Sequence, residues 1–221
     1  MRILHRTRYP LIVFDWDGTI LDSPSAIAQC IRRAAQDLGL PVPDFERASH
    51  VIGLGLADAL RTAVPDLPAA RYPEFVEAYR GHFRASEESM QLFAGMRELI
   101  AELAARHTLA IATGKSRRGL ERALDASALR PHFRASRCAD ETTPKPHPAM
   151  LLELMEETGV EPHGVLMIGD TSHDMEMARA AGVAALAVAY GAHPEAGLRA
   201  CGPLDCCADV ARLREWLTAN A

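Results

Sequence analysis

The feature that most constrains the fold is a short apolar run ending in two carboxylates, Leu11-Ile-Val-Phe-Asp15-Trp-Asp17-Gly. Such a run is typical of a buried parallel strand, whose C-terminal end lies at the edge where open α/β sheets bind ligands. Asp15 and Asp17 would point to the same side if the strand geometry continued, because strand side chains repeat every two residues. Neighbouring carboxylates repel unless a proton or cation separates them, and Mg²⁺ suits such oxygen ligands best.

The same residues have a second interpretation, a strand followed by an ordinary polar turn in which the acids only cap backbone N–H groups. The pair alone does not decide between the two interpretations. The remaining strands decide it, because they too can end in polar residues at the same edge.

Apolar segments typical of strands alternate with segments of helical periodicity along the chain. We predict strands at residues 11–14, 108–112, 133–138, 165–168, 183–188 and 205–207. We predict helices at residues 24–38, 96–106, 117–125, 148–158, 175–181 and 210–217. This alternation implies right-handed crossovers and an α/β fold with a doubly wound, Rossmann-like parallel sheet as its core.

Between the first two strands the pattern is helical from Phe45 to about Glu88, with no convincing strand. Apolar residues there recur at three- and four-residue spacing. We therefore predict an inserted α-helical cap at residues 23–93, and a core made of residues 1–22 and 94–221. Ser23 followed by Pro24 is a typical start for the first cap helix.

Later loops add polar residues to the edge that carries the two acids. These residues are Thr113, Gly114, Lys145, Asp170 and Asp174. The C-terminal ends of parallel strands meet at one edge, so we expect these residues to lie near Asp15 and Asp17.

The segment Asp15-Trp-Asp17-Gly-Thr19-Ile-Leu-Asp22-Ser23 resembles the first motif of the haloacid dehalogenase-like phosphohydrolases, with Trp16 where Phe is more common. Thr113, Lys145 and the acids from Asp170 onward follow in the order of that family's other motifs. The resemblance covers nearly the whole chain, which looks most like the phosphoglycolate phosphatase branch.

The resemblance implies a role for each residue. Asp15 would be the nucleophile that forms an aspartyl-phosphate, and Asp17 would protonate the leaving group and later deprotonate water. Thr113 would donate its hydroxyl to a phosphoryl oxygen that the Gly114 N–H can approach. Lys145 would screen the charge of Asp15 and of the phosphoryl group.

Mg²⁺ is the implied cofactor, with Asp15, Asp17, Asp170 and Asp174 as candidate ligands. Asp170 would bind the metal directly. Asp174 would reach the site only if the chain is helical from Ser172 onward, and would then act through water or by orienting a ligand. Its alternative role is that of a helix N-terminal acid favoured by the macrodipole.

Lys115 competes with Lys145 for the cationic role, and we expect Lys115 to face solvent. Gly114-Lys115-Ser116 also matches the tail of a phosphate-binding P-loop, but Leu109 stands where that motif needs glycine. We therefore reject a P-loop.

The cap fragment Gly53-Leu-Gly55-Leu lacks the third glycine of a dinucleotide-binding fingerprint, because Asp58 occupies that place. In relatives that the chain resembles, such a loop faces the active site and helps to select the substrate. Gly53 and Gly55 are therefore candidate substrate-binding residues, and an ordinary helix–helix turn is the alternative. His147 and His173 lie beside motifs, and we expect both to be structural.

Composition limits the partners. The net charge of −5 gives no electrostatic reason to expect nucleic acid or an anionic membrane. Five cysteines without C-x-x-C spacing are typical of reduced thiols in a cytosolic protein. The basic stretch Met1–Arg8 precedes too short an apolar run for a signal peptide or membrane span, so we expect a cytoplasmic protein. Monomer and homodimer both remain open.

These inferences predict a Mg²⁺-dependent phosphatase that hydrolyses a small phosphorylated metabolite, with 2-phosphoglycolate as the leading substrate. The alternatives are a sugar-phosphate mutase of the same superfamily and a pyrophosphatase or nucleotide phosphatase. The intact set of acids and lysine argues against a non-catalytic binding protein.

Overall fold

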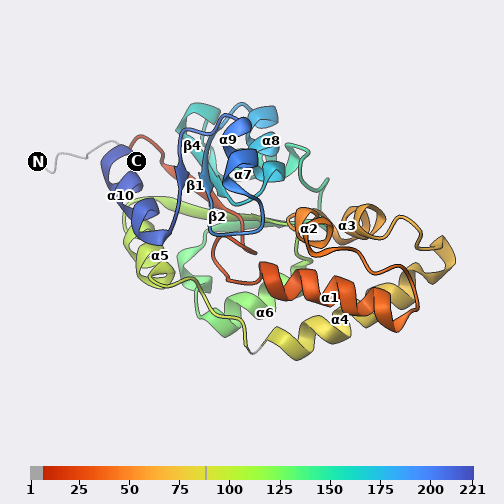
Figure 1. Cartoon of the computed structure of the whole chain (residues 1–221). Helices are drawn as coiled ribbons and strands as arrows, with labels where there is room; N and C mark the ends of the chain where they lie inside the picture. The colour runs from red at the N-terminus through yellow and green to blue at the C-terminus, as the bar shows by residue number, and fades with distance from the viewer. Residues whose placement is uncertain (1–6, 88) are drawn as a thin grey trace, which may run out of the picture.

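A computed structural model describes residues 7–87 and 89–221. Its core is a six-stranded parallel sheet of order β3-β2-β1-β4-β5-β6 (Figure 1). The strands are β1 Leu11–Phe14, β2 Thr108–Thr113, β3 Ala135–Cys138, β4 Val165–Gly169, β5 Ala184–Val188 and β6 Cys206–Cys207. The predicted Rossmann-like fold class is confirmed.

Strand β1 lies at the centre of the sheet and is wholly buried. Its last residue, Phe14, pairs with Ile111 of β2 on one side and Ile168 of β4 on the other. The next residue continues the ladder, since the Asp15 N–H donates to the Ile168 carbonyl at 2.9 Å. The loops after β1, β2 and β4 therefore start side by side.

Helices cover both faces of the sheet, as the alternation of elements requires. They are α5 Met96–Ala104, α6 Arg117–Ser127, α7 Ala149–Thr158, α8 Ser172–Ala181, α9 Glu195–Ala200 and α10 Val210–Asn220. Helices α5, α6 and α10 pack with Ile12 and Phe14 on one face. Helices α7 and α8 pack with Leu11 and Val13 on the other.

Four α-helices lie between β1 and α5, and Figure 1 shows them grouped at one side of the core. They are α1 Pro24–Asp37, α2 Phe45–His50, α3 Leu56–Ala63 and α4 Tyr72–Glu87, with a 3₁₀ turn at Ala69–Arg71. They share an apolar cluster of their own, in which Ile31, Leu60 and Phe75 are buried. We call residues 23–93 the cap, and its exact limits as a domain stay a prediction.

Several element boundaries differ from the prediction. Helix α8 begins at Ser172 rather than Met175, because Thr171 and Asp174 form a capping box at its N-terminus. Helix α9 was not predicted, since its six residues contain one buried apolar side chain, Leu198, and so no periodicity.

Some predictions fall on residues outside the described ranges. These are the first six residues of the basic N-terminal stretch and Glu88, near the predicted end of the cap. Among the described residues, no helix has both the length and the apolar character that a bilayer crossing demands.

Candidate active site

The first acid after β1 is held by a buried ion pair. Lys145 Nζ lies 2.8 Å from Asp15 Oδ1 and 2.7 Å from Asp174 Oδ1. Burial raises the pKa of the Asp15 carboxyl to about 7, an effect opposed by Lys145 and reinforced by Asp174 and Asp17. One ammonium group therefore pairs with two carboxylates that are buried away from solvent.

Asp170 lies in a tight cradle at the end of β4. Its Oδ1 accepts a hydrogen bond from Thr19 Oγ1 at 2.8 Å, and its Oδ2 accepts one from the Ala192 N–H at 2.7 Å. A Cβ atom on Gly18 would lie 2.1 Å from Asp170 Oδ2, and one on Gly191 would lie 2.2 Å from it. Only glycine fits at these two positions while Asp170 keeps its place. Burial raises the pKa of Asp170, and the charges of Asp15 and Asp174 add to this shift.

Asp174 has the helix N-terminal position considered from the sequence, and that it also serves the metal stays a prediction. Because α8 begins at Ser172, Asp174 lies in its first turn, where Oδ2 accepts hydrogen bonds from Thr171 N at 3.1 Å and Thr171 Oγ1 at 2.6 Å. These bonds leave Oδ1 directed at Lys145. The capping box thus orients a carboxylate toward the other acids.

The acids offer a site for a hard cation. Carboxylate oxygens of Asp15, Asp170 and Asp174 all lie within 4.8 Å of one another, and all three residues are buried. Asp15 Oδ2 has no hydrogen-bond partner among the described residues. One lysine cannot balance three buried carboxylates, so these residues fit a divalent cation with oxygen ligands.

The carboxylate of Asp17 does not belong to this group of three. Its Oδ1 accepts a hydrogen bond from Ser23 Oγ at 2.7 Å, and Lys115 Nζ lies 3.0 Å from Oδ1 and 2.9 Å from Oδ2. That Asp17 binds the metal stays a prediction. Ser23 was predicted to cap α1, but its side chain makes no cap hydrogen bond, because its hydroxyl is used by Asp17.

The expectation that Lys115 faces solvent is wrong. Its side chain is 8% exposed, and its ammonium lies 4.7 Å from the centre of the Phe83 ring in α4. A cap helix therefore covers Lys115, and the Asp17 carboxylate forms an ion pair with its ammonium group. A sequence does not show which distant segment will fold over a side chain.

The loop after β2 meets the cap. Thr113 is fully buried, and its Oγ1 accepts a hydrogen bond from Lys115 N at 3.2 Å. A Cβ on Gly114 would lie 2.5 Å from the Leu54 carbonyl oxygen and 2.7 Å from that of Gly53. Gly114 is therefore the residue that lets the cap backbone come this close to the core.

The Gly53–Gly55 segment joins α2 to α3 and also lies against the core. Gly53 has a φ of +92°, and a Cβ there would lie 3.2 Å from Thr171 Oγ1. A Cβ on Gly55 would lie 3.2 Å from Pro144, in the loop that carries Lys145. Together with Gly114, these contacts place the cap loop against the loops after β2, β3 and β4. That the loop binds substrate stays a prediction.

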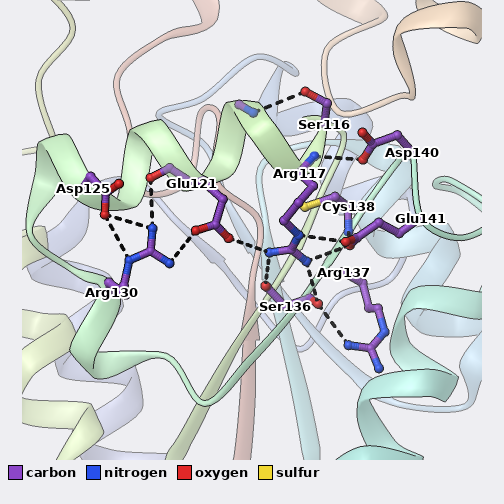
Figure 2. Close-up of polar contacts among 11 residues, drawn as sticks. Ser116, Arg117, Glu121, Asp125, Arg130, Ser136, Arg137, Cys138, Asp140 and Glu141 are labelled. Atoms are coloured by element: carbon purple, nitrogen blue, oxygen red, sulfur yellow. Dashed lines mark hydrogen bonds and ion pairs between the residues drawn. The ribbon is translucent and has the colours of Figure 1, made fainter.

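A polar network fixes the loop after β3 to the start of α6 (Figure 2). The Arg117 N–H donates to Asp140 Oδ1 at 2.8 Å, and the Arg117 guanidinium group pairs with Glu141 at 2.7 Å. Glu141 Oε2 also accepts the Cys138 N–H at 3.1 Å. The network therefore holds the segment just after Lys115 against the segment just before Lys145.

The two predicted structural histidines both make hydrogen-bond contacts, His147 within its own loop and His173 with a distant segment. His147 Nδ1 accepts the Ala149 N–H at 3.2 Å at the start of α7. His173 Nε2 lies 2.9 Å from the His50 carbonyl oxygen, and His193 Nε2 lies 3.0 Å from the same oxygen. Sequence reasoning missed His50 and His193, since neither lies in a motif. The three rings join the end of α2 to the core.

A cavity of about 990 Å³ lies between core and cap and reaches the acids. Asp15 and Asp17 form part of its core side, and Tyr79 and Phe83 of α4 form part of its cap side. The cavity is therefore bounded by the acids on one side and by cap helix α4 on the other.

Comparisons with known proteins agree with this geometry. Residues 12–188 match the family model described as haloacid dehalogenase-like hydrolase. The chain belongs to the haloacid dehalogenase-like hydrolase family. The family predicted from the sequence is thereby confirmed. The predicted enzyme class, a phosphoric monoester hydrolase, is confirmed by the family together with relatives named as phosphatases.

Individual relatives are similar over most of their length. A 5'-nucleotidase of Pseudomonas aeruginosa is 35% identical over 216 residues, which cover 96% of this chain and 97% of that protein. A phosphoglycolate phosphatase of Chromobacterium violaceum is 33% identical over 192 residues, covering 81% and 85%. A crystal structure described as a predicted phosphoglycolate phosphatase from Haemophilus somnus 129pt has a TM-score of 0.84 at 24% identity, covering 95% and 98%. This last likeness shows the shared haloacid dehalogenase-like fold.

Proposed function

We propose that this haloacid dehalogenase-like hydrolase is a Mg²⁺-dependent phosphatase of small phosphomonoesters that works through an aspartyl-phosphate at Asp15. The observation that carries the proposal is the buried, unpartnered Asp15 Oδ2 beside Lys145, at the end of the central strand. A carboxylate oxygen kept dry and free of hydrogen bonds is available to attack phosphorus.

Asp15 forms a bond to phosphorus as the ester P–O bond breaks. The leaving oxygen takes a proton from Asp17, which becomes a carboxylate. Water then attacks the aspartyl-phosphate, Asp17 takes a proton from that water, and Asp15 is released with inorganic phosphate. Asp15 and Asp17 both line the cavity, which supports their acting on the same substrate.

Lys145 and the Thr113–Gly114 loop would hold the transferring phosphoryl group. Lys145 already carries its positive charge beside Asp15, where negative charge is concentrated during transfer. Asp15, Asp170 and Asp174 would hold Mg²⁺. When bound, the ion would supply charge stabilisation of the phosphoryl oxygens.

We propose 2-phosphoglycolate as the leading substrate, which the similarity to a phosphoglycolate phosphatase supports. A nucleoside monophosphate is the second candidate. The similarity to a 5'-nucleotidase favours it, and so does a cavity of about 990 Å³ with aromatic side chains on its cap side. A sugar-phosphate mutase would use the same acids but return the phosphoryl group to a sugar.

The proposal is tested by phosphate release from a panel of phosphorylated metabolites, with Mg²⁺ and with a chelator. The native chain should turn over at least one ester only with the metal, and Asp15→Asn should not. Activity that ignores chelation, or full activity in Asp15→Asn, would contradict it. Transfer between sugar hydroxyls without phosphate release would identify the mutase alternative.

A further inference from the structure

The sequence contains two lysines among its 24 basic residues, Lys115 and Lys145. The structure places both at the active site, each against one of the two acids that follow β1. Lys145 pairs with Asp15, and Lys115 pairs with Asp17. The role proposed above for Lys145 leaves Lys115 without one.

The environment of Lys115 differs from that of Lys145 in one respect. Lys145 contacts acids that both belong to the core. Lys115 contacts Asp17 of the core through its ammonium, and the same ammonium lies 4.7 Å from the centre of the Phe83 ring on cap helix α4. An ammonium over an aromatic face is attracted to it, most strongly where water is excluded. With 8% of its side chain exposed, Lys115 meets that condition.

We propose that Lys115 is a positioning residue that orients Asp17 for proton transfer and makes this orientation depend on the cap through Phe83. The inference rests on the proposed phosphatase function, in which Asp17 moves the proton. Two donors hold the ionised Asp17 carboxylate, Ser23 Oγ on Oδ1 and Lys115 Nζ on both oxygens. When Asp17 carries the proton that it gives to the leaving group, that proton lies on Oδ2, and both donors stay on Oδ1. Without Lys115, Ser23 alone would hold one oxygen, and the carboxylate could rotate away from the leaving group.

The position of Lys115 is in turn set by the cap. Phe83 comes from an inserted segment, so movement of α4 relative to the core would move the ring and the ammonium that faces it. A closed cap would place Lys115, and hence Asp17, in the working geometry. Proton transfer would then be efficient only while the cap covers the substrate, a coupling that disfavours loss of the ester half-way through the reaction.

The leaving group provides the readout. Proton donation matters for an alkyl phosphate such as 2-phosphoglycolate and matters little for 4-nitrophenyl phosphate, whose leaving group is stable as an anion. A role in binding phosphate alone would affect both esters equally. Single-turnover rates of Asp15 phosphorylation, measured with saturating Mg²⁺, separate the two roles.

Lys115→Met should lower the single-turnover rate with the alkyl ester by about tenfold or more, a part of the usual contribution of general acid catalysis. With 4-nitrophenyl phosphate the rate should change less than about threefold, the residual expected when protonation is not needed. Lys115→Arg should restore most of the loss, because a guanidinium can contact both Asp17 oxygens. Arg179→Met, on the exposed end of α8, is the matched control and should behave as the native chain.

The link to the cap is tested by Phe83→Leu, with Phe45→Leu as its control, since Phe45 is an exposed phenylalanine of the cap. Phe83→Leu should slow the alkyl ester selectively, by about two- to tenfold for loss of one cation–π contact. It should have no further effect once Lys115 is methionine. Because the chain has two lysines, ¹³C-lysine labelling gives two Cε signals, and Phe83→Leu should move the one that Lys115→Arg removes.

Equal losses with both esters, multiplying effects of the two substitutions, or a Lys115 signal indifferent to Phe83→Leu would overturn the proposal while leaving the phosphatase standing. A native chain that turns over no ester of the metabolite panel in the presence of Mg²⁺ would overturn the proposed function and this inference with it. The spectrum needs no turnover, so the contact itself is measured separately from catalysis.

Discussion

Lys145 Nζ lies 2.8 Å from Asp15 Oδ1, and neither side chain is more than 1% exposed. The same ammonium is 2.7 Å from Asp174 Oδ1. Burying these charges costs solvation energy, which is offset only by the attraction between the lysine and the two carboxylates. These ion pairs therefore contribute both to the stability of the fold and to the chemistry of the site.

Lys145→Met should destabilise the fold strongly, because it leaves two buried carboxylates without their cation. Removing one partner of a buried pair typically costs about 3–5 kcal/mol. Arg61→Met, which breaks an exposed pair with Asp58, should cost only about 0–1 kcal/mol. Urea unfolding monitored by circular dichroism measures both free energies. Similar values for the two variants would contradict the account of Lys145.

Metal-free stability should depend on pH through the buried acids. The pKa of Asp15 rises from 3.8 to about 7 in the folded chain, and that of Asp170 also rises. The folded state then holds more protons than the unfolded state between these values, so stability should fall as pH rises from about 4 to about 7. At the proposed site Mg²⁺ would bind the ionised acids, so it should raise the melting temperature more at pH 7.5 than at pH 5.

Differential scanning fluorimetry at the two pH values, with Mg²⁺ or a chelator, measures this difference. In Asp15→Asn, which removes one titrating acid, the metal-free decline should be smaller. A melting temperature equally raised by Mg²⁺ at both pH values would argue against binding at these acids.

Gly191→Ala should weaken metal binding. The added Cβ would lie 2.2 Å from Asp170 Oδ2, so the carboxylate must move out of its cradle. Displacing the support of a metal ligand typically costs about 10–100-fold in affinity. Gly197→Ala is the control, because a Cβ there meets no heavy atom within 4 Å. Titration calorimetry with Mg²⁺ compares them, and equal affinities would exclude Asp170 as a ligand.

Much of this site could be predicted because its residues sit at the ends of strands. Asp15 and Asp170 follow β1 and β4, Thr113 is the last residue of β2, and these three strands are neighbours in the sheet. Parallel topology alone brings such strand ends together. The position of Asp174 depended on where α8 begins. That start is encoded by a local pattern, Thr171 with Asp174 three residues later.

What the sequence did not predict depends on contacts that form only once the chain has folded, most of them between distant segments. Lys115 looked exposed because Phe83, which covers it, is 32 positions earlier in the chain. Ser23 looked like a helix cap from the sequence. Its hydroxyl instead donates to Asp17, because the turn after β1 brings the two side chains together. His50 and His193 are far apart in sequence and meet only through the packing of α2 on the core. No local propensity encodes these pairings.

Gly114→Ala should disturb the junction of cap and core. Its Cβ would lie 2.5 Å from the Leu54 carbonyl oxygen, so the cap loop would be pushed away from the active site. We expect KM to rise and kcat to fall together, as for substitutions that hinder closure. Gly81→Ala in α4, where a Cβ meets nothing within 4 Å, should leave both parameters near native values. Steady-state kinetics would contradict the inferred contact if the two variants behaved alike.

The central claim is that Asp15 carries the phosphoryl group during turnover, and trapping that intermediate tests it most directly. The native chain is mixed with Mg²⁺ and the ester that it hydrolyses, quenched in acid during turnover and reduced with borohydride, which converts an aspartyl-phosphate to homoserine. Peptide mass spectrometry should then find homoserine at position 15, and only when the ester was present. Homoserine at another acid, or phosphate release with position 15 unchanged, would contradict the mechanism.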